Sequence, residues 1–361
     1  MKVTLFRDLP TERWWSMERY ANELAAALRA LGVEVTEYVP RRPFPQLQGA
    51  AHTLLNYAWR LGVYPLLARA HQGDINHIID HSYAHLLYTL DARRTIVTCH
   101  DIAPLALNER GHGVSRIVFD AALKATQRAS RLIAISHSTR AELLKFTSYP
   151  KEQIDVIWYG VNPEFGVSGS SLEIQTLRTS LNATHRPILL HVGSCAPRKN
   201  IEVIIHALSY LVDLNPLWVQ VGGQFSASQR SLIAKKQLAS YVYQAPQATG
   251  RALVNWYHLA DVFVFPSIYE GFGMPVLEAL MAGLPTVTST TTSLPEISGE
   301  ATLLVAPDDA FSLAQAVRSI LTDSNIRESL RIKGLEHSQK FTWQTTAQKT
   351  LEIYQAVYSQ L

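Results

Sequence analysis

The chain alternates short apolar runs with longer stretches in which apolar residues recur at helical spacing. The stretch from about Met17 to Leu31 places Tyr20, Leu24 and Leu28 on one face and is followed by Gly32, a common helix terminator. The apolar runs of the first half predict strands at Val3–Phe6, Val33–Val39, Ile75–Ile79, Thr95–Cys99, Leu132–Ser136 and Ile154–Trp158. Strands separated by helices in this way indicate a doubly wound parallel sheet.

The same pattern starts again in the second half, after a polar stretch rich in Ser, Thr and Asn. We place an interdomain linker in that stretch, at residues 166–185, between an N-terminal domain (1–165) and a C-terminal domain (186–340). A last amphipathic helix occupies 341–361. The expected elements of the second half are strands at Ile188–Gly193, Leu217–Val221, Tyr241–Tyr243, Val262–Ser267 and Thr286–Thr288, and helices at Ile201–Val212, Ser226–Ala239 and Trp343–Leu361. Two similar α/β halves with a cleft between them are the expected architecture.

The composition agrees with a globular protein. The 361 residues are 47% hydrophobic and 17% charged, and the formal net charge is +3. That charge is too small to indicate nucleic acid as a partner. Cys99 and Cys195 cannot form a disulfide framework and suit a reducing cytosol. The first residues do not resemble a signal peptide, and no uncharged apolar run reaches the ~18 residues of a membrane-spanning helix. We therefore expect a cytoplasmic protein.

One stretch raises the question of a membrane surface. Residues 40–70 combine basic, aromatic and apolar side chains, among them Arg41-Arg42, Trp59-Arg60, Leu66-Leu67 and Arg69. Such a stretch can rest on the inner face of an anionic bilayer. A core helix with a solvated edge explains it equally well, so both interpretations stay open.

The strongest chemical signal is the segment EGFGMPVLEA, residues 270–279. Glu270 and Glu278 flank a turn containing Gly271 and Gly273, which follows a predicted strand and leads into a helix. Backbone N–H groups at a helix N-terminus favour an anion such as a phosphate. Carboxylates accept hydrogen bonds from sugar or ribose hydroxyls. The segment therefore predicts a site for a phosphorylated sugar compound at the carboxyl edge of the sheet.

A second loop, GSCAPRKN at residues 193–200, also follows a strand and precedes a helix, which Asn200 is placed to cap. Arg198 and Lys199 are expected at the same sheet edge as Glu270, where two cations suit a diphosphate. Taken alone, the loop is equally well explained as a solvated basic turn. The neighbouring glutamate segment favours the phosphate interpretation.

In the first half, His100 follows a predicted buried strand. We expect it to face the cleft and to donate a hydrogen bond to a sugar hydroxyl or a developing charge. The alternative is a structural histidine bonded to its neighbour Asp101. The start of the first helix, at Ser16 and Glu18, is another place for an anion or a sugar, unless Ser16 simply caps that helix.

Three histidines, His77, His81 and His85, have the four-residue spacing of metal ligands on one helical face. His77 falls on a predicted strand, however, so that geometry fails and we expect no metal site. Asp308-Asp309 precedes an apolar helix and is expected to cap it.

Together these motifs resemble the signature of the retaining group 1, mannosyltransferase-like glycosyltransferases. The resemblance covers most of the chain and is highly specific over residues 188–310. It implies the GT-B fold, in which two Rossmann-like doubly wound parallel-sheet domains face a cleft and the C-terminal helix crosses back onto the N-terminal, acceptor domain. The matching segments are 260–267, 270–279, 282–285, 198–200, 293–296 and 100–104.

The resemblance implies a role for each matching position of the donor site. Glu278 would hold the ribose hydroxyls of the nucleotide. Glu270 and the amides of Phe272, Gly273 and Met274 would hold donor-sugar hydroxyls and the diphosphate.

The remaining roles fall on other loops. Arg198 and Lys199 would neutralise the departing diphosphate without a metal, and His100 would contact the donor sugar near the reacting carbon. The base would lie near Tyr243. Where many members of the family have Gly-Gly beside the phosphates, this chain has Trp15 and Ser16, with Ser16 the expected contact.

The expected function is transfer of a hexose from a nucleotide-diphospho-sugar, GDP- or UDP-linked, to a saccharide or lipid-linked acceptor, with retention and without a cofactor. The Arg-Lys-Asn form of the second loop favours GDP-mannose. Two alternatives are a non-catalytic sugar-nucleotide-binding protein of the same fold and a sugar-nucleotide epimerase, which should lack the full 270–279 signature. The sequence does not identify the acceptor.

Overall fold

The computed structural model describes residues 1–10, 15–40, 55–107, 114–167 and 171–361, and the chain divides into two compact units. Unit 1 comprises residues 1–160 and 343–361, and unit 2 comprises residues 161–342. The range 166–185, expected as a linker, falls within unit 2 and contains helix α7 (Ser171–Ser180). None of the residues of α7 is buried, which explains why its composition resembled that of a linker.

Unit 1 is built on a six-stranded parallel sheet with the order β2-β1-β3-β4-β5-β6. Its central strands are almost entirely buried, as expected for a parallel sheet covered on both faces. The strands are β1 (Lys2–Phe6), β2 (Glu34–Tyr38), β3 (Ile75–Ile78), β4 (Thr95–Cys99), β5 (Arg131–Ala134) and β6 (Ile154–Val156). The helices are α1 (Trp15–Ala30), α3 (Tyr64–Ala68), α4 (Ala103–Ala106), α5 (Val114–Thr126), α6 (His137–Phe146) and α15 (Trp343–Tyr358), with the 3₁₀ helix η4 at His81–Tyr88.

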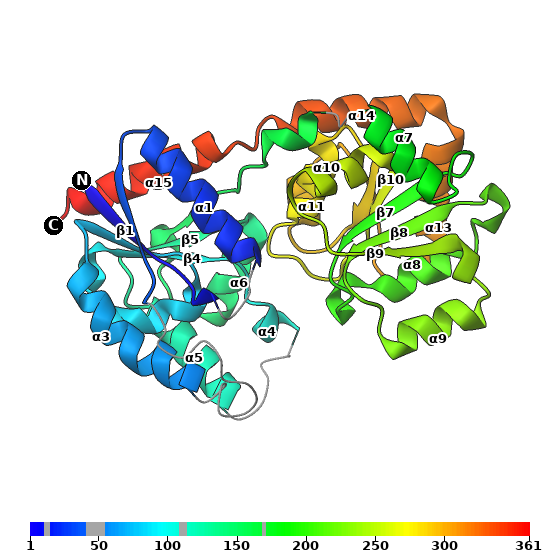
Figure 1. Cartoon of the computed structure of the whole chain (residues 1–361). Helices are drawn as coiled ribbons and strands as arrows, with labels where there is room; N and C mark the ends of the chain where they lie inside the picture. Colours follow the sequence, from blue (N-terminus) through cyan, green and yellow to red (C-terminus); the bar gives the residue numbers. More distant parts are fainter. Residues whose placement is uncertain (11–14, 41–54, 108–113, 168–170) are drawn as a thin grey trace. The chain divides into compact units, whose positions relative to one another are not determined.

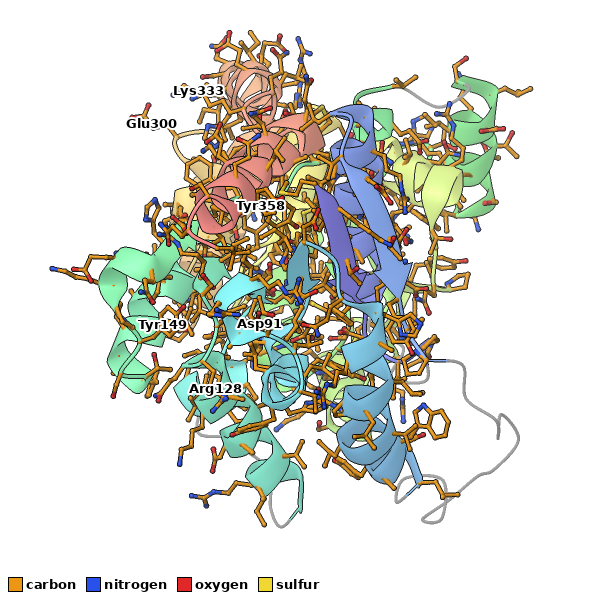
Figure 2. The ribbon with its side chains drawn as sticks, turned by 90° about the vertical axis from the view of Figure 1, so that its left-hand side faces the viewer. Asp91, Arg128, Tyr149, Glu300, Lys333 and Tyr358 are labelled. Atoms are coloured by element: carbon orange, nitrogen blue, oxygen red, sulfur yellow. The ribbon has the colours of Figure 1, made fainter. Side chains whose placement is uncertain are left out.

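The last helix of the chain, α15, completes unit 1. It packs beside α1 on one face of the sheet, while α5 and η4 pack together on the other (Figure 1). Figure 2 shows the pairing of α15 and α1 from another side, with Tyr358 labelled at the end of α15. The Tyr354 hydroxyl lies 2.6 Å from Nδ1 of the buried His77 on β3. The rings of Trp343 and Tyr20 are 6.1 Å apart, so α15 belongs to the packed layer of this unit.

Unit 2 has a second six-stranded parallel sheet, with the order β12-β11-β10-β7-β8-β9. Helices α7, α10, α11 and α14 cover one face, and α8, α9 and α13 cover the other (Figure 1). The strands are β7 (Ile188–Gly193), β8 (Leu217–Gly222), β9 (Val242–Ala245), β10 (Val262–Phe265), β11 (Thr286–Ser289) and β12 (Leu303–Val305). The remaining helices are α8 (Ile201–Leu208), α9 (Ala227–Lys235), α10 (Gly250–Leu259), α11 (Met274–Met281), α12 (Leu294–Ser298), α13 (Ala310–Thr322) and α14 (Ser324–Ser338).

In each sheet the strand order reverses direction at one point. In unit 1 the chain proceeds outward from β1 to β2 and then crosses back to β3 on the other side of β1. In unit 2 it proceeds from β7 to β9 and crosses back to β10 on the other side of β7. The loops that follow the two strands at such a reversal diverge, and the crevice between them is where open α/β sheets bind ligands.

Capping residues account for several element boundaries. Ser136 has extended backbone angles and its hydroxyl accepts the Thr139 N–H, so β5 ends earlier than predicted and α6 begins at His137. Asp309 caps α13 through the Ser312 N–H, as predicted. Gly283, with φ +67°, follows the last turn of α11.

The stretch proposed to meet a membrane is only partly described, since Arg41 and Arg42 lie outside the described residues. Leu66 is 70% exposed, whereas Arg60 is buried and donates to the Ser82 carbonyl at 2.6 Å. Arg60 is therefore a structural side chain. Among the described helices, none has the length and apolar character needed to cross a bilayer.

Candidate functional site

The glutamate loop and the basic loop of unit 2 meet at the reversal point of its sheet. The basic loop follows β7 and the glutamate loop follows β10, which is paired with β7. The Ile268 N–H donates to the Arg198 carbonyl at 2.8 Å, so the two loops are joined through their backbones. The sequence prediction that these loops share one sheet edge is confirmed.

The centre of the site is a buried carboxylate held by two cations. Glu270 is 8% exposed, and its Oε1 lies 2.5 Å from Lys199 Nζ. Its Oε2 lies 3.3 Å from Nη1 of Arg198, whose side chain is 36% exposed. Lys199 Nζ also sits 4.6 Å from the centroid of the Phe265 ring, a cation–π distance. Lys199 is therefore a fixed buried charge, while Arg198 is partly open to solvent.

The charge of Glu270 follows from these contacts. Burial disfavours the carboxylate, but the charges of Lys199 and Arg198 and the hydrogen bonds to the carboxylate outweigh burial and lower the pKa of Glu270. Glu270 is thus a carboxylate with two oxygens that accept hydrogen bonds.

Asn200 fixes the turn between the basic loop and α8. Its backbone is in the left-handed region, with φ 58°, a conformation that asparagine tolerates better than most residues. Its side-chain amide donates to the carbonyls of Pro266 at 3.0 Å and Pro307 at 2.5 Å. Asn200 occupies the N-cap position of α8, as predicted, but its side chain makes no cap hydrogen bond to that helix. The side chain instead ties together the loops after β7, β10 and β12.

A buried histidine supports the other end of the basic loop. His191 of β7 stacks on Phe265, and its Nδ1 lies 2.7 Å from Gln220 Oε1. The Gln220 amide donates to the Gly193 carbonyl at 2.8 Å. Burial first, and then the charge of Lys199, lower the pKa of His191 to about 3, so it is neutral beneath the lysine.

Two residues of the loop after β11 hold the glutamate loop through hydrogen bonds to its backbone. The Glu270 N–H donates to the Thr292 hydroxyl at 3.1 Å. The buried Ser293 hydroxyl lies 2.9 Å from the Glu270 carbonyl and 2.8 Å from the Phe272 carbonyl. Neither residue could be recognised as a support from the sequence, because a serine just before a helix is typical of an ordinary cap and its partners are 21 to 23 residues away.

Glycine is required at position 273. Its φ is +105°, and a Cβ there would lie 2.8 Å from Cδ2 of Leu294. The turn sets the start of α11, whose first residue is Met274 and whose first turn contains Pro275. The first amides of a helix have no partner within it, so this terminus favours an anion.

Glu278 lies on α11, one turn beyond the loop. It is 3% exposed, and its Oε2 accepts the Tyr257 hydroxyl of α10 at 2.8 Å. No local sequence pattern marks Tyr257, because its role depends on a partner 21 residues away. Tyr243 lies on the edge strand β9, 39% exposed and 6.3 Å from the Trp256 ring. Its proximity to a base stays a prediction.

His100 lies in unit 1, immediately after β4, and is 3% exposed. Its Nε2 lies 2.6 Å from the Ile79 carbonyl, and its Nδ1 is hydrogen-bonded to the Tyr159 hydroxyl. Because a carbonyl only accepts, the neutral ring donates from Nε2 and accepts at Nδ1. Burial is the main cause that lowers the pKa of His100. Its partners are thus Ile79 and Tyr159, not Asp101, and binding a sugar hydroxyl requires exchanging one of them.

Ser16 is exposed and lies inside the first turn of α1, which begins at Trp15, so it does not precede the helix as a cap would.

His77 lies on β3, as predicted, while His81 and His85 lie on η4. His81 Nδ1 is 3.2 Å from Asp80 Oδ1. His85 Nε2 is 2.8 Å from a backbone carbonyl, so the three rings serve separate structural contacts.

Comparison with known proteins adds a family context to this geometry. A model of "Glycosyl transferases group 1" matches residues 173–337, and a model of "Glycosyltransferase Family 4" matches residues 17–165. The serotype-specific mannosyltransferase WbdA of Escherichia coli is 33% identical over 270 residues, which cover 72% of this chain and 33% of WbdA. The O-antigen chain mannosyltransferase B of Escherichia coli is 26% identical over 72% of this chain and 70% of its own length. This chain spans about a third of the length of WbdA.

Among solved structures, Anabaena HepE in complex with UDP and glucose superposes with a TM-score of 0.79 at 18% identity. The match covers 99% of this chain and 100% of HepE. With the two six-stranded parallel sheets, this likeness confirms the predicted GT-B fold class.

Proposed function

Because the chain belongs to the group 1 glycosyltransferases, we propose that it transfers a hexose from a nucleotide-diphospho-sugar to a saccharide or lipid-linked acceptor, with retention at the anomeric carbon. The observation that carries the proposal is the buried Glu270 carboxylate, held by Lys199 and Arg198 beside the N-terminus of α11. The site supplies cations and amides for a diphosphate and carboxylates for hydroxyls.

The chemistry follows from where charge develops. Cleavage of the sugar–phosphate bond leaves negative charge on the diphosphate and positive charge on the anomeric carbon. We assign Arg198, Lys199 and the amides of Gly273 and Met274 to the leaving diphosphate, because fixed donors stabilise developing charge best. Glu270 keeps lone pairs for donor-sugar hydroxyls while it holds Lys199 in place. This assignment needs no metal ion, so transfer should be unchanged by EDTA.

Four further residues complete the proposed donor site. Glu278, positioned by Tyr257, accepts the ribose hydroxyls. His100 contacts the donor sugar, and Ser16 and Tyr243 stay predicted contacts of the phosphates and the base.

The proposed donor is GDP-mannose. The names of two relatives favour it, since WbdA and mannosyltransferase B are both mannosyltransferases. The structure of HepE, by contrast, contains UDP and glucose, so a UDP-linked hexose is the alternative donor to test beside GDP-mannose. We further propose a cytoplasmic location with peripheral contact to the inner face of the membrane, which fits a lipid-linked acceptor.

A non-catalytic sugar-nucleotide-binding protein is the second candidate. The observation in its favour is that both ring nitrogens of His100 are engaged within unit 1. An enzyme should hydrolyse its bound donor slowly without an acceptor, whereas a binder should leave it intact. Hydrolysis is measured as release of free mannose, with His100→Ala as the comparison.

The first test is a thermal-shift panel of GDP-, UDP- and ADP-sugars on the wild type, Glu278→Ala and the control Glu300→Ala. Glu300 is an exposed carboxylate of the same unit (Figure 2). A ligand at about 100 times its Kd stabilises by roughly 2.7 kcal/mol. The proposal expects a shift selective for one base, lost in Glu278→Ala and kept in Glu300→Ala. A shift with none of the nucleotides would contradict it, and the anomeric configuration of a transferred sugar, read by NMR, tests retention.

A further inference from the structure

His100 is enclosed in unit 1 by aromatic rings from separate parts of the chain. The Tyr20 ring of α1 meets the His100 ring edge-on, with centroids 5.1 Å apart, and the Tyr159 ring lies 5.8 Å from it. Tyr159 in turn packs against Tyr20 at 4.9 Å and stacks on Trp343 of α15 at 5.9 Å, with 26° between the ring planes. All four side chains are buried. Because the Tyr159 ring is packed against two others, its hydroxyl has a fixed direction.

The backbone beside Tyr159 is also held. Tyr159 follows β6, and Gly160 is the last residue of the first segment of unit 1. Trp343 is the first residue of the second segment, so the two stacked rings stand where the chain leaves unit 1 and where it returns. The Thr346 hydroxyl of α15 donates to the Trp158 carbonyl at 2.8 Å, next to Tyr159 in the chain. The last helix therefore fixes Tyr159 through its ring and through the adjacent peptide.

The hydrogen bonds of His100 specify which ring nitrogen carries the hydrogen. Nε2 lies 2.6 Å from the Ile79 carbonyl, which can only accept, so Nε2 carries the hydrogen of the neutral ring. Nδ1 then has a lone pair, and the Tyr159 hydroxyl donates to it. Burial raises the pKa of Tyr159 well above its usual value, so the hydroxyl keeps its hydrogen. A donor fixed at Nδ1 favours the neutral ring, because a protonated ring has no lone pair there.

A second buried histidine of the same unit provides a comparison. His77 Nδ1 lies 2.6 Å from the Tyr354 hydroxyl, and its Nε2 lies 2.7 Å from the Thr98 hydroxyl. His77 lies within β3, inside the sheet. His100 instead follows β4 at the carboxyl edge, where doubly wound sheets bind their ligands. A tyrosine–histidine bond can thus be purely structural, whereas the one at His100 stands where it can act on a ligand.

The protonation state of His100 matters because of the charge that develops beside it. In the proposed function His100 contacts the donor sugar, whose anomeric carbon becomes positive as the sugar–phosphate bond breaks. A neutral imidazole donates a hydrogen bond to a sugar oxygen without adding charge. An imidazolium at the same place would repel that carbon and raise the barrier.

We propose that Tyr159 is a positioning residue for His100, whose imidazole its hydroxyl keeps as a neutral donor at Nε2 beside the carbon that becomes positive. When the donor sugar binds, Nε2–H exchanges the Ile79 carbonyl for a sugar oxygen, while the Tyr159 hydroxyl stays at Nδ1. Trp343 acts through Tyr159 by holding its ring. The assignment rests on the proposed function, because it concerns a substrate contact of that reaction.

Other ionisable groups also influence the charge of His100. They are the carboxylates Asp80 and Asp101 and the imidazoles His77 and His81. Burial is the largest cause that lowers the pKa of His100, while the two carboxylates oppose it. None of these groups is changed when the Tyr159 hydroxyl is removed, so Tyr159→Phe isolates the effect of that hydroxyl.

The test compares Tyr159→Phe with the control Tyr20→Phe. Each variant removes one buried hydroxyl from the same aromatic cluster, but the Tyr20 hydroxyl has the Thr98 hydroxyl as its partner, at 3.1 Å. The first readout is an NMR pH titration of the His100 ring in the full chain, with its signal identified by its absence in His100→Ala. His100 should take up a proton at higher pH in Tyr159→Phe than in the wild type, and Tyr20→Phe should titrate like the wild type.

The second readout is the rate of mannose release from GDP-mannose between pH 8 and pH 5, with melting temperatures recorded for all variants. A neutral hydrogen bond weights an equilibrium by roughly fivefold. The rate of Tyr159→Phe relative to Tyr20→Phe should therefore fall by up to about fivefold as the pH falls, because the variant protonates His100 earlier. The affinity for GDP, which lacks the sugar, should stay within about twofold of the wild type in both variants.

The outcomes separate this role from the proposed function. Identical His100 titrations in the two variants would overturn the proposal, because the hydroxyl would then turn to accept from the protonated ring. A rate ratio that is constant across the pH range would also overturn it, because the charge of His100 would not affect the reaction. Either result leaves the proposed function standing when the wild type releases mannose. A wild type that releases no mannose refutes the proposed function and, with it, this role of Tyr159.

Discussion

The Lys199–Glu270 pair gives the sharpest quantitative test of how the candidate site is held together. Lys199→Met keeps the length of the side chain and removes its charge, which leaves Glu270 buried with Arg198 as a weaker partner at 3.3 Å. Removing one member of a buried ion pair costs about 3–5 kcal/mol. Because Arg198 still attracts the carboxylate, the expected loss is at the lower end, about 3 kcal/mol.

The assay is amide hydrogen exchange of peptides that cover β7 and β10, because a two-unit chain need not unfold in one step. A loss of about 3 kcal/mol speeds exchange through opening roughly a hundredfold. Lys333→Met, at an exposed lysine of the same unit (Figure 2), is the matched control and should change exchange little. The double variant Lys199→Met/Glu270→Gln should lose less than the sum of the two single variants.

The pH dependence of the same measurement tests the cause. In the wild type the pKa of Glu270 is lowered, so its stabilisation is present above the unfolded carboxylate pKa and is lost only as the pH falls through the lower folded pKa. In Lys199→Met we expect burial, the largest cause, to outweigh the remaining attraction of Arg198 and to raise the pKa of Glu270 above the unfolded value. The cost of Lys199→Met should then shrink as the pH falls from about 7.5 to about 5. A cost below about 0.5 kcal/mol, or one that does not depend on pH, would refute the reasoning.

Three further predictions concern unit 2. Asn200→Ala should lower the free energy of unfolding by about 3 kcal/mol, and Asn200→Gly should lower it by about 2 kcal/mol. Both variants lose two hydrogen bonds, but only alanine disfavours the left-handed backbone at this position. Equal losses of the two variants, measured by urea unfolding, would contradict this prediction. Gly273→Ala should weaken nucleotide binding by at least about tenfold in a calorimetric titration. Adding Leu294→Ala removes the clash with the new Cβ but should restore binding only in part, because φ stays at +105°. Full recovery of binding would show that the contact with Leu294 alone matters. The pKa of His191 is lowered to about 3, so below its ordinary value of 6.5 the unfolded chain binds a proton that the folded chain does not, and stability should fall by roughly 2 kcal/mol between pH 6.5 and pH 5. In His191→Phe the free energy of unfolding, measured by urea unfolding, should depend less on pH between pH 6.5 and pH 5. An unchanged pH dependence would show that other groups cause it.

The sequence predicted the parts of the candidate site that follow strands directly. Glu270 and Lys199 lie in loops after neighbouring strands, and parallel topology alone brings such loops to one edge. The supports of the site were not predictable in this way. Ser293 and Tyr257 are ordinary hydroxyl residues whose partners lie more than 20 residues away, so no local pattern marks them.

The same limit explains why the side-chain partners of Asn200 and His100 could not be predicted. Asn200 stands where a capping residue is expected, but its side chain has better acceptors in loops that only the folded sheet brings near. The orientation of His100 depends on Tyr159, 59 residues further along the chain. Its strand could be predicted, whereas the direction of its ring could not.

The discontinuity of unit 1 has a consequence for the order in which the protein folds during synthesis. Residues 161–342 leave the ribosome as one uninterrupted piece, so unit 2 can complete its sheet early. Unit 1 cannot, because the helix that covers one face of its sheet and supplies Tyr354 to the buried His77 is translated after the whole of unit 2. At about 5–20 residues per second, the apolar face beside α1 stays uncovered for roughly ten to forty seconds. During that interval the nascent first half of the chain is a natural client for chaperones.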